Sequence, residues 1–143
     1  MLQHPDISHL IQLAVAPVFL LTAVGTLLSV LSSRLGRVVD RIRMLDALPS
    51  DLDVKARAAC DGELEVQSRR MRLVYTAMVL AVFCGLFVGL LMVLAFIEAF
   101  LGLNLWLAVG LLFIASMLAF IASLCVFLRE IFVAVTSMHS PMR

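Results

Sequence analysis

Three long runs without a charged residue dominate this sequence. Residues 10–33, 73–97 and 99–128 contain no Asp, Glu, Lys or Arg. A helix needs about 20 apolar residues to cross a hydrocarbon core about 30 Å thick, and each run is long enough. Because the core offers no water, a spanning segment must satisfy its own backbone hydrogen bonds, as a helix does. The runs therefore predict an all-α integral membrane protein with three transmembrane helices.

The composition agrees with this prediction. The chain is 63% hydrophobic and 15% charged, whereas soluble domains average about 45–50% apolar and about 25% charged residues. A transmembrane β-barrel would show alternating segments of about ten residues, and none is visible. The first run is too long for a signal peptide and ends in Arg34 rather than at a cleavage site, so we expect a retained helix.

The positions of the basic residues predict the topology. Nine of the eleven Lys and Arg lie between the first and second runs, and Arg129 and Arg143 follow the third. Lys and Arg near the ends of membrane helices remain on the cytoplasmic side. We therefore expect the N-terminus outside, the middle segment inside, a short turn near Gly102 outside and the C-terminus inside.

Helical periodicity continues beyond the first uncharged run. Apolar residues recur at helical spacing up to Leu45, and Pro49 then breaks the pattern. A second helix follows and runs through Arg72 into the membrane. This pattern predicts a cytoplasmic antiparallel hairpin formed by extensions of helices one and two. The expected single membrane domain, residues 1–143, comprises transmembrane segments 10–33, 73–97 and 105–128, the hairpin 34–72 and a cytoplasmic tail 129–143.

The first transmembrane segment is the most polar of the three, and its polar residues follow one line. Positions separated by alternate steps of three and four stay on one face of a helix in a left-handed bundle. On this line lie Gln12, Val15, Phe19, Thr22, Thr26, Ser29, Ser33 and Arg37. Copies of helix one around a common axis would form a pore lined by hydroxyl groups, with an apolar constriction at Val15 and Phe19. We therefore expect a homo-oligomeric ion channel.

The same pattern has a simpler interpretation. Ser and Thr are common where membrane helices pack, because they are small and form hydrogen bonds between helices or with their own backbone. The alternative function is a non-conducting scaffold, or an accessory subunit that uses this line to bind a larger partner. The small residues Gly25, Gly36, Gly85 and Gly89 also allow close helix approach, within one chain or between chains.

Charged residues at the ends of the runs have their own expected roles. Arg34, Arg37, Arg41 and Arg43 form a basic cluster that could attract anionic lipids, at about 1 kcal/mol for each residue near the surface. Topology determination alone would also explain this cluster. Arg129 and Glu130 mark the inner end of helix three, where we expect snorkelling and local pairing.

The sequence contains no pattern typical of an enzyme. It has no nucleophile–base pairing, phosphate-binding loop or metal-ligand cluster, and residues 34–72 contain no His. A hydrolytic or group-transfer activity is therefore not expected, and neither is a cofactor, a metal or a nucleic-acid partner. Self-association and contact with the bilayer are the expected interactions.

Two stretches resemble a known family. They are IQLAVAPVFLLTAVGTLLSVLSSRLGRVVDRIRML at residues 11–45 and LLFIASMLAFIASLCVFLREI at residues 111–131. With the spacing between them, they resemble a family of small prokaryotic membrane proteins catalogued as a domain of unknown function. The AVAP and VVDRIR runs carry most of the resemblance, which covers nearly the whole chain. It implies a bacterial inner-membrane protein, and it implies neither an activity nor functional residues.

Overall fold

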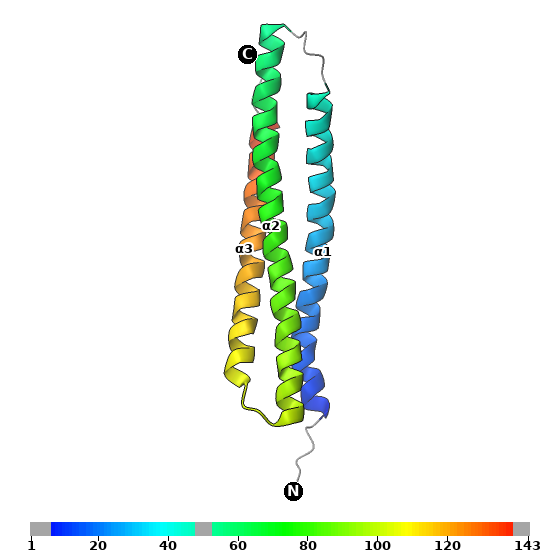
Figure 1. Ribbon diagram of the computed structural model, residues 1–143, viewed down its shortest axis with the longest axis vertical. Helices are drawn as coiled ribbons and strands as arrows, with labels where there is room; N and C mark the ends of the chain where they lie inside the picture. The colour runs from blue at the N-terminus through cyan, green and yellow to red at the C-terminus, as the bar shows by residue number, and fades with distance from the viewer. Residues whose placement is uncertain (1–6, 48–52, 139–143) are drawn as a thin grey trace. The chain divides into compact units, whose positions relative to one another are not determined.

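Three long helices make up the described part of the protein. The computed structural model describes residues 7–47 and 53–138, and the side chains of residues 15–47 and 53–136. Helix α1 spans Ile7–Asp46, α2 spans Val54–Leu101 and α3 spans Trp106–Met138 (Figure 1). All three are long and apolar enough to cross a membrane. The prediction of an all-α fold with three helices long and apolar enough to span a membrane is confirmed.

All three helices continue beyond their uncharged runs: the periodicity predicted this for α1, and α3 extends to Met138, into the segment expected to be a tail. Helix α1 has 40 residues and ends at Asp46, which is thirteen residues beyond Ser33. Helix α2 begins at Val54, nineteen residues before Leu73. At 1.5 Å per residue, α1 is about 60 Å long, roughly twice the thickness of a hydrocarbon core. The expected break at Pro49 lies outside the described residues.

The connection between α2 and α3 is short. Helix α2 ends at Leu101, and α3 begins at Trp106. Gly102 has a φ of 65°, and its N–H donates to the carbonyl of Glu98 at 3.0 Å. A residue in this left-handed conformation closes many helices, and glycine adopts it without a Cβ clash. The predicted turn at residues 101–104 is therefore present, and Gly102 supplies its conformation.

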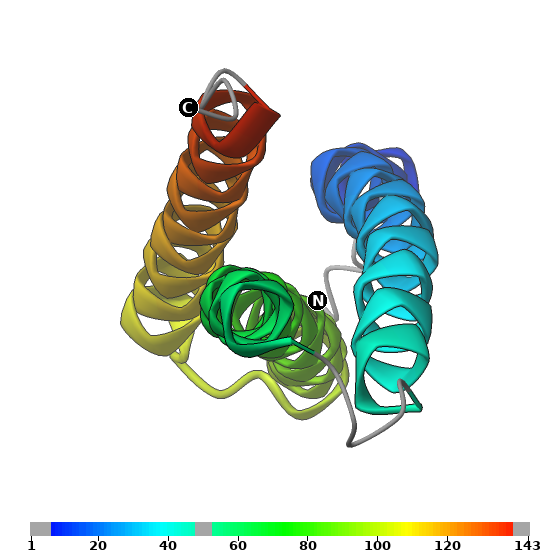
Figure 2. The same cartoon turned by 90° about the horizontal axis from the view of Figure 1, so that it is seen from above.

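The chain divides into two compact units, each built from one stretch of every helix. The first unit comprises Met1–Leu28 and Leu80–Ala122, and the second comprises Ser29–Val79 and Ser123–Arg143. Figure 2 shows the three helices from above. The second unit holds most of the polar contacts.

The buried residues of each helix follow a seven-residue repeat. On α1 the repeat is Pro17, Val24, Leu31, Val38 and Leu45, and on α3 it is Ser116, Ser123 and Glu130. Helix α2 buries both positions of the repeat, at Val74, Ala77, Ala81, Cys84, Val88 and Leu91. This spacing keeps the buried line on one face when helices coil gently around each other. Small side chains on α2 and α3 permit the close approach that membrane helices use.

Much of the remaining surface is apolar. In the most apolar 18-residue stretch of each helix, only 22% of the residues are buried in α1, 22% in α2 and 11% in α3. Large side chains such as Leu86, Leu90, Ile114 and Leu118 are exposed. A continuous apolar surface of this extent is unfavourable in water but matches hydrocarbon. Together with helix length, it indicates a multi-pass membrane protein.

Candidate functional site

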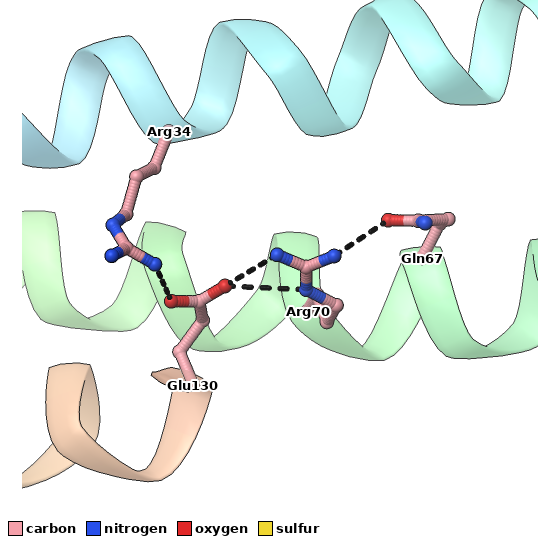
Figure 3. Close-up of polar contacts among 4 residues, drawn as sticks. All are labelled: Arg34, Gln67, Arg70 and Glu130. Carbon is pink, nitrogen blue, oxygen red and sulfur yellow. Dashed lines mark hydrogen bonds and ion pairs between the residues drawn. The ribbon is translucent and has the colours of Figure 1, made fainter. Parts of the chain in front are cut away.

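The most unusual side chain of the second unit is a buried carboxylate. Glu130 of α3 is fully buried and receives hydrogen bonds from arginines on the other two helices. Figure 3 shows Arg34 approaching it from α1 and Arg70 from α2. We call Arg34, Arg70 and Glu130 the triad.

Each carboxylate oxygen of Glu130 has its own partner. Arg34 Nη1 donates to Oε2 at 2.9 Å. Arg70 donates to Oε1 through Nη2 at 2.9 Å and through Nε at 3.2 Å. Arg70 Nη1 also donates to Gln67 Oε1 at 3.5 Å (Figure 3). Both oxygens of the buried acid are thereby satisfied, which removes the large penalty of an unpaired buried charge.

The arginines remain partly accessible. The side chain of Arg34 is 30% exposed and that of Arg70 is 19% exposed, whereas that of Glu130 is 0% exposed. The guanidinium carbon of Arg34 also lies 5.0 Å from the centre of the Phe127 ring, a cation–π distance. The triad therefore buries one negative charge completely and leaves two positive charges partly exposed.

The positions of the triad along the chain place it at the ends of the apolar runs. Arg34 directly follows the run 10–33, Arg70 precedes the run 73–97 by three residues, and Glu130 follows the run 99–128 by two. A membrane that covered the three runs would have its surface at the level of the triad. The triad thus joins the three helices at the point where each is expected to leave the hydrocarbon.

This arrangement differs from the one that the sequence predicts. Local pairing of Glu130 with its neighbour Arg129 is the expectation, but Glu130 pairs with Arg34 and Arg70, which are 96 and 60 residues away in the sequence. Adjacent residues on a helix point about 100° apart, so Arg129 is exposed while Glu130 faces the core. The available signal was the seven-residue spacing of Ser116, Ser123 and Glu130, which predicts one buried face.

The same unit contains three further polar contacts between helices, one of which is a long hydrogen bond from Cys60 Sγ to the carbonyl of Leu45 at 4.0 Å. Ser123 donates from its buried hydroxyl to the carbonyl of Ala77 at 2.7 Å. Arg41 Nε donates to Glu63 Oε1 at 2.7 Å, in an ion pair whose side chains are 49% and 37% exposed. Two members of the predicted lipid-binding cluster, Arg34 and Arg41, therefore already have carboxylate partners.

The predicted pore-lining residues share one structural property. The side chains of Val15, Phe19, Thr22, Thr26, Ser29, Ser33 and Arg37 are all exposed on the single chain. Gln12 lies in α1, but its side chain is outside the described part. Most of these residues lie two positions before or after a buried residue of the repeat, roughly 200° around the helix. The polar line thus points away from the core of its own chain.

Two hydroxyl groups on this line bond within α1. Thr22 donates to the carbonyl of Val18 at 3.1 Å, and Thr26 donates to the carbonyl of Thr22 at 3.0 Å. Arg37 Nη1 lies 3.4 Å from Ser33 Oγ, a weak hydrogen bond. The threonine protons are satisfied by the helix itself, so their oxygens keep lone pairs that can accept from outside.

The glycines have different surroundings. A Cβ built on Gly85 would lie 3.7 Å from Val24 Cγ1, an ordinary van der Waals contact. At Gly25, Gly36 and Gly89, a Cβ would meet nothing within 4 Å among the described neighbours. Close packing within the chain therefore rests on buried Ala, Ser and Cys side chains, and the surfaces at these three glycines are open.

Among the described residues, no group of three or more His, Cys, Asp or Glu side chains could hold a metal ion. A family model with the description "Protein of unknown function (DUF2721)" matches residues 14–140. No curated protein and no solved structure matches the chain.

Proposed function

We propose a function for this chain, which belongs to the DUF2721 family of proteins of unknown function, from the exposed polar line of α1. Copies of the chain would assemble in a membrane with this line facing a shared axis, and the axis would conduct ions. The lining residues would be Gln12, Val15, Phe19, Thr22, Thr26, Ser29, Ser33 and Arg37.

The observation that carries the proposal is the direction of this line. Its described side chains are exposed and lie opposite the buried repeat of α1. A packing seam within the chain would require them to face α2 or α3, and they do not. The line is therefore available to a second copy, a partner or a pore. Lipid is the least favourable neighbour for an arginine and a row of hydroxyls.

The hydroxyl geometry supports a water-filled or ion-filled axis. Since Thr22 and Thr26 donate to their own helix, their oxygens can only accept from a neighbour. Acceptor groups along a pathway stabilise water and partly dehydrated cations. Phe19, 71% exposed, is the largest side chain on the line and would form its narrowest point. Arg37 would lie at one mouth, where its charge would oppose cation entry.

The proposed orientation places residues 34–72 and the C-terminus in the cytoplasm, because the basic residues concentrate there. A bacterial inner membrane is the proposed location. Within the second unit, Leu45 contacts Cys60 and Arg41 contacts Glu63, an order that supports an antiparallel hairpin. Single cysteines at Ser50 and Gly102, with the three native cysteines replaced, test the orientation. An impermeant thiol reagent should reach the first only from the cytoplasm and the second only from outside.

Two measurements test the channel. The mass of the detergent-extracted particle should correspond to a closed ring of copies. In reconstituted bilayers, Phe19→Ala should raise ion flux, because a wider and wetter constriction lowers the entry barrier. Arg37→Glu should shift selectivity towards cations. The matched control is Phe96→Ala, which removes an exposed phenylalanine of α2 instead and should leave flux unchanged.

A monomeric particle would end the channel proposal, and so would silence of both the wild type and Phe19→Ala over a wide range of voltage and pH. The second candidate, a non-conducting scaffold or accessory subunit, draws on the same exposed line. Satisfied threonine protons also suit a dry helix–helix interface. A wild-type particle that contains a second protein, lost on Ser29→Leu, would support that function.

A further inference from the structure

Four exposed arginines surround the triad. Arg37 is three residues from Arg34 on α1, Arg69 and Arg72 flank Arg70 on α2, and Arg129 precedes Glu130 on α3. All four side chains are exposed. We call Arg37, Arg69, Arg72 and Arg129 the arginine belt.

The triad puts the belt at one level. Because Arg34 and Arg70 both bond to Glu130, the three residues lie within the reach of an arginine side chain of one another along their helices. No belt residue is more than three positions from a triad member, so each lies within about 4.5 Å of that member along the helix at 1.5 Å per residue. Four guanidinium groups from three helices therefore share one layer of the second unit.

Glu130 does not neutralise the positive charge of the arginine belt. Within three residues of the triad members there are six arginines and a single acid, Glu130, so six positive charges less one negative charge give +5. Glu130 is already bonded to Arg34 and Arg70. Among the described residues, no carboxylate pairs with a belt arginine. The layer thus exposes a strong positive charge that the described residues do not neutralise.

The charge changes sign beyond this layer. Residues 38–46 and 53–66 contain four basic residues, Arg41, Arg43, Lys55 and Arg57. They also contain six acids, Asp40, Asp46, Asp53, Asp61, Glu63 and Glu65. Four less six gives −2. The positive surface is therefore a band rather than a basic hairpin. A long polyanion such as a nucleic acid would be repelled by the net negative charge of this hairpin.

Exposed apolar side chains lie directly beside the belt. Tyr75 follows Arg72 by three residues and is 62% exposed, and Leu128 and Phe132 flank Arg129 and are 52% and 63% exposed. A ligand that matches both features carries a phosphate next to a hydrocarbon chain. Anionic phospholipids have this structure, and the belt lies where the uncharged runs end.

We propose that the belt binds the phosphate headgroups of anionic phospholipids, and that Glu130 determines which arginines do so. Glu130 withdraws Arg34 and Arg70 into the triad and leaves Arg37, Arg69, Arg72 and Arg129 free for lipid. This set differs from the cluster expected from sequence, in which Arg34 and Arg41 have carboxylate partners instead. Arg37 also belongs to the proposed pore line, so the proposal rests on Arg69, Arg72 and Arg129, which are not on that line, and it holds whether or not the chain conducts ions.

The test compares lipids retained by the full-length protein. The protein is reconstituted in vesicles with equal amounts of phosphatidylglycerol and phosphatidylcholine and then extracted in mild detergent. The lipids that remain bound are counted by native mass spectrometry. The wild type should be enriched in phosphatidylglycerol, and high salt should reduce the enrichment. The belt variant Arg69→Gln, Arg72→Gln, Arg129→Gln should bind phosphatidylglycerol about a hundredfold more weakly than the wild type.

A matched variant removes the same number of charges elsewhere. Arg43→Gln, Lys55→Gln, Arg57→Gln changes three exposed residues of the distal hairpin and should retain the enrichment. Replacing the three belt arginines with Lys should also retain it, because the charge persists. If the triple Gln variant does not fold, the single change Arg129→Gln should still lower the enrichment.

Three results would overturn the proposal. The first is equal enrichment in phosphatidylglycerol in the wild type and the belt variant. If the belt variant does not fold, equal enrichment in the wild type and Arg129→Gln has the same meaning. The second is an equal loss in the belt and hairpin variants, which would indicate attraction by net charge alone. The third concerns the source of the phosphate. If inorganic phosphate displaces phosphatidylglycerol at equal concentration, the site recognises a free anion rather than a lipid.

Discussion

The two units of this protein use different interactions to hold the same three helices. In the first unit, the described contact between helices is apolar: Val24 of α1 lies against Gly85 of α2, beside the buried side chains of Ala81 and Val88. In the second unit, three ion pairs and a hydrogen bond from Ser123 join the helices. Dispersion contacts are not directional, whereas charge-assisted hydrogen bonds to both oxygens of one carboxylate restrict how the helix faces can rotate. The second unit therefore holds the directional interactions that fix the rotation of its own three helix segments.

The largest expected effect is the loss of the buried acid. Glu130→Gln removes the charge that Arg34 and Arg70 share and leaves two guanidinium groups without a counter-charge. Breaking a buried ion pair by removing one partner costs about 3–5 kcal/mol. We expect a loss of this order, measured by thermal or denaturant unfolding in detergent. The control is Glu65→Gln, an exposed acid in the same unit, and an equal effect of both changes would contradict a special role for the triad.

The next effect probes the apolar unit. Ala81 is 0% exposed on the buried repeat of α2, so Ala81→Leu would insert three carbon atoms into a closely packed position. Overpacking of this kind costs about 1–3 kcal/mol. Val82→Leu, at an exposed neighbouring position, should change the unfolding midpoint little. If both variants unfold like the wild type, the first unit is loosely packed, and the stability of the fold depends even more on the ion pairs of the second unit.

A smaller effect is expected from the interhelical hydroxyl. Ser123→Ala removes the hydrogen bond to the carbonyl of Ala77, and such a bond contributes about 1 kcal/mol. Thr76→Ala is the control, because its exposed hydroxyl donates to the carbonyl of Arg72 on its own helix. Equal unfolding midpoints for the two variants would show that the bond from Ser123 to Ala77 does not stabilise the packing of α2 against α3.

The smallest effect should come from the exposed ion pair. Arg41 and Glu63 are 49% and 37% exposed, and pairs of this kind contribute about 0–1 kcal/mol because water and salt screen them. A double-mutant cycle with Arg41→Gln and Glu63→Gln measures the coupling. A coupling as large as that between Arg70 and Glu130 would show that burial does not distinguish the two ion pairs.

The local pattern of the sequence was sufficient for the elements of this fold. The uncharged runs predicted three spanning helices, the stripe up to Leu45 predicted the extension of α1, and Gly102 marked the turn. These features depend on residues close together in the chain: a helix bonds each residue to one four positions away, and a single apolar run determines whether a segment can enter lipid. For the same reason, the spacing of residues in the sequence is enough to place Val15 to Arg37 on one face of α1.

Only the tertiary structure decided which charges meet. In the sequence, Glu130 stands beside Arg129, while Arg34 and Arg70 are two of nine basic residues between the first and second runs. No local rule selects a partner 60 or 96 residues away, because the pairing depends on the rotation of each helix about its axis. That rotation is set by the buried seven-residue repeats of all three helices together. It turns Glu130 towards the core and Arg129 outwards, and it leaves the polar line of α1 facing away from its own chain.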